Sequence, residues 1–507
     1  MTESSQRKSG AILSYFSIII NMVIQLLYTP LLIKMLGQSE YGLYSLISSI
    51  IGYLTVLDMG FGNALIVYTA KYRAQGKIEE EKKLHGMFFL IFCIIGVIAG
   101  ILGLILYFNV ENIFGATMTS GEIAKAKVMM LILAFNLAIT FPFTIYSSII
   151  SAYEKFTFQK IMSILNTSLK PLLMLPLLFL GFKSITMTIV ITVVNIFVLL
   201  SNFFYCRNKL KIRIKYLGFD KALFKTIFSY SFFIFLGVVV DKVNWNVDQF
   251  ILGAISGTAA VSVYSVAAQL NSLFINLSTA VSGVMLPKMS KMVATKATSS
   301  EITDEFVKIG RIQYIIIFLM ASGLVIFGQL FIQIWVGKEF ADAYYIALLL
   351  IIPLCIPLIQ NLGLSIMQAM NKYKFRTIAM FIMSLFNIII SIFLAKKYGA
   401  IGAALGTGIS LIIVNVIIIN IYYHKVIKID IIKFWKEILK MTPPMLISAL
   451  VIGILTKVLK MHSFFGFIIF GGLYVLIYSI AVYKFSINDY EKNLVNKFLK
   501  KIKLIKG

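Results

Sequence analysis

The chain of 507 residues is strongly apolar and strongly basic. Hydrophobic residues make up 59% of it, charged residues only 13%, and the mean hydropathy is +0.91. This composition excludes an ordinary soluble globular domain and predicts an integral membrane protein. The net charge of +26 would indicate nucleic-acid binding in a soluble protein. In a membrane protein, the placement of the lysines and arginines instead indicates which side of the membrane each connection faces.

Runs of about 20 apolar residues, long enough to cross the hydrocarbon core as helices, recur along almost the whole chain. They predict an all-α protein with about fourteen transmembrane helices. The expected spans, in chain order, are 12–35, 41–69, 86–108, 127–151, 159–181, 185–206, 226–253, 259–287, 312–334, 342–369, 377–395, 400–423, 441–458 and 464–483.

Lysine and arginine concentrate in alternate connections between these spans. By the positive-inside rule, this bias places the basic connections and both termini in the cytoplasm, and predicts a multi-pass membrane protein. The basic surplus then faces the anionic lipids of the inner leaflet, so no nucleic-acid partner is expected. A C-terminal surface helix is also expected, with an apolar stripe of Leu494, Phe498, Ile502 and Ile505.

Residues that carry out catalysis or hold metals are scarce. The three cysteines and three histidines are scattered in or at the ends of the spans, with neither disulfide nor metal-ligand spacing. No glycine-rich phosphate loop and no nucleophile arrangement is found. We therefore expect no enzyme activity, no metal and no cofactor.

Two halves of the sequence match each other. Shifted by 220 residues, "LGQSEYGLYS" (36–45) lies over "SGTAAVSVYS" (256–265), and shifted by 217, "AYEKFTF" (152–158) lies over "AMNKYKF" (369–375). Because six spans separate the copies, the halves are expected to share one orientation in the membrane. The sequence therefore predicts an N-terminal lobe (1–206), a basic cytoplasmic linker (207–225), a C-terminal lobe (226–424), and two further helices with a basic tail (425–507).

Several longer segments carry a family resemblance. They are "LGQSEYGLYSLISSIIGYLTVLDMGFGNALIVYTAKY", "VDQFILGAISGTAAVSVYSVAAQLNSLFINLSTAVSGVMLPKMSKM", "IWVGKEFADA" and "YGAIGAALGTGIS". With the two six-helix lobes, they make the chain resemble the polysaccharide flippases of capsule and O-antigen pathways, the Wzx type of the MATE-like superfamily. The resemblance implies that the protein moves an undecaprenyl-pyrophosphate-linked oligosaccharide to the outer leaflet, by alternating opening of a cleft between the lobes.

Ionisable residues inside the spans are the first candidates for function. In "DKVNWNVD" (241–248), Asp241, Trp245 and Asp248 share one helical face, while Lys242 points about 100° away. The repeat places Asn21, Gln25 and Tyr28 on the matching face of the first span. Such polar faces are unfavourable against lipid and are expected to line a wet cleft.

The fifth span carries Asn166 and Lys170 on one face, and Lys170 is followed by Pro171, which frees a backbone carbonyl. Cationic side chains are expected to bind the pyrophosphate, amides the sugar hydroxyls, and aromatic rings a sugar face. The predicted substrate-binding residues are Lys170, Lys242, Asn166, Asn21, Gln25, Tyr28, Trp245 and Gln269.

The membrane carboxylates Asp241, Asp58 and Asp248 are candidates for a coupling ion, H⁺ or Na⁺, although the membrane potential alone is an alternative driving force. Each also has a structural interpretation. Asp58 could cap a helix locally at "DMGFGN", Asp248 could lie near the outer interface, and Asp241 with Lys242 could form an ion pair with other helices.

Three other functions remain open. A multidrug cation exporter of the same superfamily would also use a membrane carboxylate, but its cargo would meet the cations Lys170 and Lys242. Lipid II flippases have an arginine-lined cavity, whereas all six arginines here lie outside the expected spans. A membrane glycan polymerase or ligase would need a larger outer loop than the longest one here, although such an enzyme is a possible pathway partner.

Overall fold

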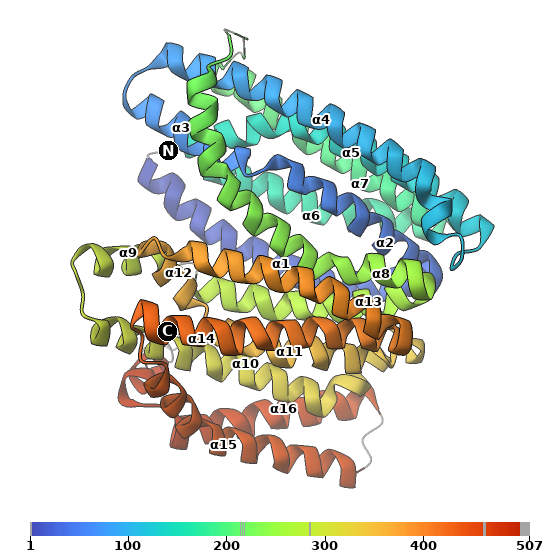
Figure 1. Ribbon diagram of the computed structural model, residues 1–507. Coiled ribbons are helices and arrows are strands. Elements are labelled where there is room, and N and C mark those ends of the chain that lie inside the picture. Colours follow the sequence, from blue (N-terminus) through green and yellow to red (C-terminus); the bar gives the residue numbers. More distant parts are fainter. Residues whose placement is uncertain are drawn as a thin grey trace, which may run out of the picture. The chain divides into compact units, whose positions relative to one another are not determined.

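The computed structural model describes residues 3–212, 214, 216, 218–282, 285–459 and 463–496, and every regular element among them is a helix (Figure 1). The predicted all-α membrane class is thus confirmed. Among these residues, eleven helices are long and apolar enough to cross a membrane, or twelve if the bent pair α11 and α12 forms one span. That number does not confirm the fourteen spans expected. Phe498, Ile502 and Ile505 of the expected surface helix lie outside the described residues.

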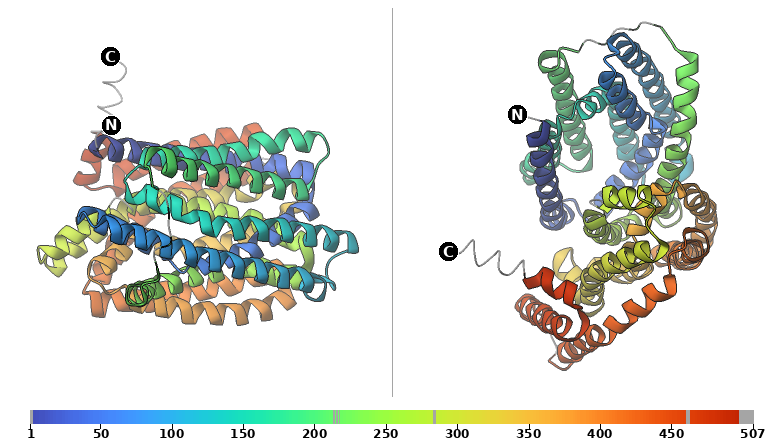
Figure 2. Two further views of the ribbon diagram at one scale, coloured as in Figure 1. Left: turned by 90° about the horizontal axis from the view of Figure 1, so that it is seen from above. Right: turned by 90° about the vertical axis from the view of Figure 1, so that its left-hand side faces the viewer.

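The chain divides into two compact units. Unit 1 comprises residues 1–265 and 380–403, and unit 2 comprises residues 266–379 and 404–507. These units do not coincide with the predicted lobes, because unit 1 includes the chain from 226 to 265. The two six-helix lobes therefore stay a prediction. In the right-hand view of Figure 2, most helices of each unit are seen nearly end-on, so they run along a common direction within that unit.

Unit 1 is built from long helices that pack side by side. Its elements before residue 210 are α1 (Glu3–Leu36), α2 (Gln38–Leu54), η1 (Thr55–Asp58), α3 (Phe61–Ala74), α4 (Ile78–Phe114), α5 (Ser120–Ala152), α6 (Phe156–Phe179), α7 (Ser184–Phe204) and η2 (Tyr205–Lys209). Helix α4 packs along α5, α5 along α7, and α1 along α6. Small residues allow the close approach of α4 to α5: a Cβ on Gly96 would lie 2.5 Å from the carbonyl oxygen of Ala138.

Helix α8 (Lys221–Ser282) is a hairpin rather than one continuous rod. Gly257 has φ 78° and ψ −176°, a conformation that glycine adopts without a Cβ clash. The hydroxyl of Tyr264 donates to Asp248, sixteen residues earlier. Along a straight helix these residues would be about 24 Å apart, so the chain must reverse at the glycine. The sequence predicts the end of one span and the start of the next at this place.

Helix α13 (Tyr373–Leu411) reverses in the same way at Gly399, where φ is 57° and ψ is −136°. The hydroxyl of Ser391 lies 3.3 Å from the carbonyl oxygen of Ala403, and a Cβ on Gly402 would lie 2.1 Å from the carbonyl oxygen of Leu394. The matching glycine breaks in α8 and α13 lie where the sequence places turns between spans.

Unit 2 contains the remaining helices and a core near the C-terminus. Its elements, besides the end of α8 and parts of α13, are α9 (Leu286–Ala294), α10 (Ser299–Trp335), η4 (Lys338–Phe340), α11 (Ala343–Ile359), α12 (Leu362–Ala369), η5 (Ile412–Ile418), α14 (Ile419–Tyr422), η6 (Tyr423–Ile427), α15 (Ile431–Val458), α16 (Phe464–Ala481) and η7 (Val482–Ser486). Helices α10, α15 and α16 pack together around buried Phe327, Met445 and Tyr478.

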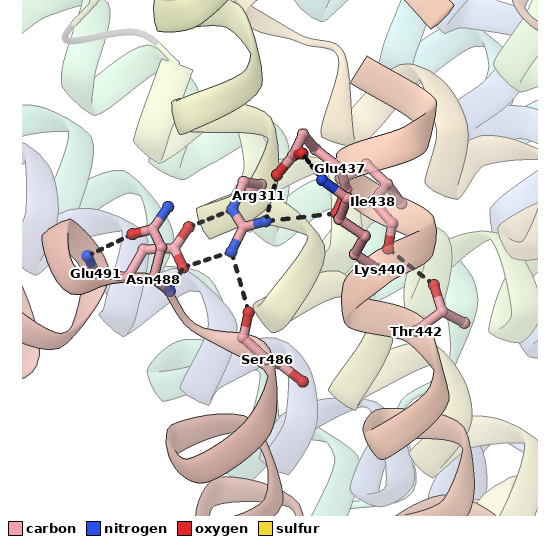
Figure 3. A network of polar contacts seen from close by, with 8 residues as sticks. All are labelled: Arg311, Glu437, Ile438, Lys440, Thr442, Ser486, Asn488 and Glu491. Atoms are coloured by element: carbon pink, nitrogen blue, oxygen red, sulfur yellow. Dashed lines mark hydrogen bonds and ion pairs between the residues drawn. The ribbon is translucent and has the colours of Figure 1, made fainter. Parts of the chain in front are cut away.

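A buried arginine on α10 binds α15 and the segment of chain that follows α16 (Figure 3). Arg311, on α10, is only 5% exposed. Its Nε and Nη2 donate to the two carboxylate oxygens of Glu491 at 2.7 and 2.9 Å, and its Nη1 donates to Glu437 on α15 at 3.1 Å. Nη2 also donates to the carbonyl of Ser486 at 3.0 Å. Although the sequence placed Arg311 just outside a span, the side chain lies within a long helix and is buried.

Candidate functional site

Helix α6 carries Lys170, the candidate cation of the fifth predicted span. Lys170 and Asn166 are four residues apart and therefore lie on one face of the helix. Both side chains are half-buried. Within the described part of the chain, the Lys170 ammonium has no ion pair or hydrogen bond, and the Oδ1 atom of Asn166 is buried without a hydrogen-bond partner. A cation and an amide oxygen thus remain available on this face.

Helix α1 supplies the second polar face. Asn21, Gln25 and Tyr28 are half-buried on it, and the Oε1 atom of Gln25 is buried without a hydrogen-bond partner. Because α1 packs along α6, the structure brings the two predicted faces onto a pair of neighbouring helices in unit 1. Leaving a buried polar atom unsatisfied is unfavourable by about 1–3 kcal/mol, so each such atom calls for an explanation. A bound polar ligand that hydrogen-bonds these atoms is one such explanation.

The first arm of α8 places its polar residues at different depths. Asp241 is exposed, and Lys242 and Trp245 are half-buried. The carboxylate of Asp241 interacts electrostatically with the neighbouring ammonium of Lys242. Further along the arm, the side chain of Asn246 would lie 3.3 Å from a Cβ on Gly52 of α2. This arm therefore packs on α2 within unit 1, and the assignment of its residues to the substrate stays a prediction.

Asp248 is the most buried of the candidate carboxylates. It is 1% exposed and accepts a hydrogen bond from Tyr264 on the second arm of α8. Its position near the outer interface, the structural interpretation from the sequence, stays a prediction. Here the carboxylate links the two arms of a hairpin. Its role as a coupling residue is untested and stays a prediction.

Asp58 lies at a break that the sequence expects from its glycines. The predicted span 41–69 is divided into α2, η1 and α3, with left-handed backbone at Met59 and Gly60. The backbone N–H groups of Gly60 and Gly62 face the carboxylate, while its Oδ1 atom is buried without a partner. The carboxylate therefore lies at the N-terminus of α3, where a negative charge is favoured.

Polar side chains on α5 and α7 bind each other and serve helix packing. Asn195 on α7 donates to Asn136 at 2.6 Å and to Thr140 at 2.8 Å, both on α5. The sequence shows the line of hydroxyls and amides on α5, but only the structure shows that a neighbouring helix binds it. Gln269, on the second arm of α8, is half-buried, and its role also stays a prediction.

Comparison with known proteins places the chain in a family. Residues 8–293 match the family described as "Polysaccharide biosynthesis protein". The chain belongs to this family. A relative from Shigella flexneri, described as "Putative O-antigen transporter", is 23% identical over 386 residues, which cover 75% of this chain and 88% of the relative. The predicted resemblance to polysaccharide flippases is thereby confirmed.

Solved structures of the same fold extend the comparison. The lipid II flippase MurJ, in an inward closed conformation, has a TM-score of 0.72 at 22% identity, covering 94% of this chain and 98% of its own. An inward-facing multidrug resistance MATE family transporter of the MOP superfamily has a TM-score of 0.61 at 13% identity, covering 79% of this chain and 96% of its own. At these identities the likeness establishes the fold of this multi-pass membrane protein.

No group of three His, Cys, Asp or Glu side chains suited to a metal ion occurs among the described residues. Cys93, Cys206 and Cys355 are free thiols.

Proposed function

We propose that this protein is a flippase that moves an undecaprenyl-pyrophosphate-linked oligosaccharide from the cytoplasmic to the outer leaflet of a bacterial cytoplasmic membrane. Support comes from the polysaccharide biosynthesis family and from the O-antigen transporter relative. The observation that carries the proposal is the half-buried side chain of Lys170, whose ammonium has no partner in the described part of the chain. An unpaired cation inside a membrane helix is costly unless it serves a ligand or a pathway.

The substrate has three chemically different parts, and the residues of unit 1 suit two of them. Lys170 would attract the pyrophosphate as a point charge, with Lys242 as a second cation on α8. Asn21, Gln25 and Asn166 would exchange hydrogen bonds with sugar hydroxyls, since amides both donate and accept. Tyr28 and Trp245 would stack on sugar rings. The lipid tail would stay in the bilayer.

Transport would proceed by alternating opening of the two predicted lobes, with both termini in the cytoplasm. In a cell that is negative inside, moving about two negative charges outward across 100 mV is favoured by roughly 4–5 kcal/mol. Asp58 and Asp241, with Asp248 as a third candidate, would bind a coupling proton or sodium ion if a gradient contributes. Liposomes in which flipping ignored both gradients would exclude that coupling and leave the membrane potential as the driving force.

The main test is a genetic and vesicle assay. Deletion of the gene is expected to leave lipid-linked oligosaccharide on the cytoplasmic face, where a membrane-impermeant lectin or glycosidase reaches it in everted vesicles. Intact surface glycan together with a loss of drug resistance would instead favour a multidrug exporter. A lipid II flippase would be indicated if the trapped lipid carried the peptidoglycan precursor, and a polymerase if unpolymerised glycan accumulated on the outer face.

Substitution of Lys170 tests the site itself. Lys170→Met keeps much of the side-chain volume but removes the charge, so it is expected to abolish most export, whereas Lys170→Arg should retain part of it. Lys183→Ala is the matched control, because Lys183 is exposed in the loop before α7. Normal glycan export by a well-expressed Lys170→Met variant would remove Lys170 from the site.

A further inference from the structure

A cavity of about 450 Å³ lies where three connections of unit 1 meet. Its walls come from the end of α3 and the start of α4, from the loop after α5, and from residues 210–212 after η2. The charge bias of the sequence predicts that all three connections lie on the cytoplasmic side of the membrane. We therefore expect the cavity to lie at the depth of the inner-leaflet headgroups. It is a different place from the helix faces that carry Lys170 and Gln25.

One part of the lining is cationic. The guanidinium carbon of Arg73 lies 4.4 Å from the centre of the Tyr153 ring, a cation–π contact. Neither Arg73 nor Lys211 has a carboxylate partner among the described residues, and both side chains are exposed. Lys82, by contrast, pairs with Glu79 at 2.7 Å. Arg73 and Lys211 thus leave positive charge available for an anion.

Another part of the lining is a buried carboxylate. Glu81 is 7% exposed and accepts a hydrogen bond of 2.8 Å from the hydroxyl of Tyr153. Burial and the adjacent Glu81 carboxylate raise the pKa of Tyr153, so its hydroxyl keeps the proton that it donates. The Nε2 atom of His85 is 3.9 Å from Glu81 and 3.1 Å from the Thr69 hydroxyl.

Glu81 has no lysine or arginine partner in the described part of the chain. A buried carboxylate is unfavourable unless a cation or several donors compensate it. The Tyr153 ring joins the two charged parts of the cavity, with Arg73 over its face and Glu81 at its hydroxyl. The cavity therefore presents a cation at the face of one aromatic ring and a carboxylate at the hydroxyl of the same ring, a charge pattern that suits a zwitterionic ligand.

We propose that this cavity binds the headgroup of phosphatidylethanolamine from the inner leaflet. The phosphate diester would lie against Arg73 and Lys211, and the primary ammonium would donate hydrogen bonds to Glu81. Ile78, 62% exposed at the rim, would contact the acyl region. Phosphatidylglycerol would leave Glu81 uncompensated, and the trimethylammonium of phosphatidylcholine has no N–H to donate. This site is independent of the proposed transport function.

Lipid binding to the purified full-length protein is measured by native mass spectrometry. The competing lipids, all with identical acyl chains and tested in pairs, are phosphatidylethanolamine, phosphatidylglycerol and phosphatidylcholine. A separate experiment measures whether free phosphoethanolamine displaces the bound lipid. The wild type should prefer phosphatidylethanolamine about tenfold, since one charge-assisted hydrogen bond is worth that much. Glu81→Gln, which still accepts a hydrogen bond from Tyr153, should abolish this preference. The double variant Arg73→Ala with Lys211→Ala should weaken the binding of all three lipids.

Matched controls separate the site from general charge effects. Glu80→Gln changes an exposed neighbouring carboxylate that does not line this cavity, and Lys71→Ala removes an exposed cation from the same helix as Arg73. Both should bind lipid as the wild type does. The proposal is overturned if Glu81→Gln keeps the wild-type preference, if the three lipids bind equally to the wild type, or if free phosphoethanolamine displaces the lipid at equal concentration.

Discussion

Tyr264 donates a hydrogen bond to Asp248 across the reversal of α8 at Gly257, and this bond satisfies part of a buried carboxylate. Tyr264→Phe removes the donor but keeps the ring, so the free energy of unfolding should fall by about 1–3 kcal/mol. The measurement is thermal unfolding in detergent. Tyr107→Phe is the control, because no hydrogen bond of the Tyr107 hydroxyl occurs among the described residues. Equal midpoints for the two variants would contradict the importance of this bond.

Gly42 allows α2 to approach the turn of α8 very closely. A Cβ at this position would lie 1.9 Å from the carbonyl oxygen of Thr258, which is backbone and must shift. Gly42→Ala should therefore lower stability by about 1–3 kcal/mol or more, as overpacking does. Gly121→Ala, with nothing within 4 Å of its new Cβ, should be neutral or slightly stabilising. A stable Gly42→Ala protein would show that the two elements separate easily.

Asn166 and Asn195 are expected to respond to the same substitution in opposite ways. Asn166→Leu removes a buried oxygen without a partner and should raise stability by about 1 kcal/mol while lowering oligosaccharide export. Asn195→Leu removes bonds to Asn136 and Thr140 and should lower stability by about 1–2 kcal/mol. Thermal midpoints and surface glycan are measured together. A destabilised Asn166→Leu variant with normal export would argue for a packing role.

Arg311 should be among the most sensitive positions in unit 2. Arg311→Met leaves the buried carboxylate of Glu491 without its cation, and breaking a buried pair in this way lowers stability by about 3–5 kcal/mol. Glu437 keeps its ion pair with Lys440. Arg207→Met, at an exposed arginine, is the control. Adding Glu491→Gln to Arg311→Met should recover part of the loss, because it removes one uncompensated charge. Thermal unfolding of the wild type, Arg311→Met, Glu491→Gln and the double variant measures the coupling, and strictly additive losses would contradict it.

The apolar runs, the two glycine turns and the family resemblance were accessible from the sequence because they depend on local composition and spacing. Apolar length predicts a membrane helix without knowledge of its neighbours. Gly257 and Gly399 lie at predicted turns and adopt positive φ there. The polar faces with Asn21 and Gln25, and with Asn166 and Lys170, also follow from helical periodicity alone.

What each polar side chain contacts depended on the tertiary structure. The sequence lists Asn136, Asn166 and Asp248 alike as polar residues in apolar helices. The structure shows that Asn195 donates a hydrogen bond to Asn136 and that Tyr264 donates one to Asp248. The Oδ1 atom of Asn166, by contrast, is buried without a hydrogen-bond partner. Arg311 and Glu491 are 180 residues apart, so no local pattern predicts their pairing. Periodicity determines which face of a helix is polar, but only packing between distant segments decides whether that face meets another helix or remains available for a ligand.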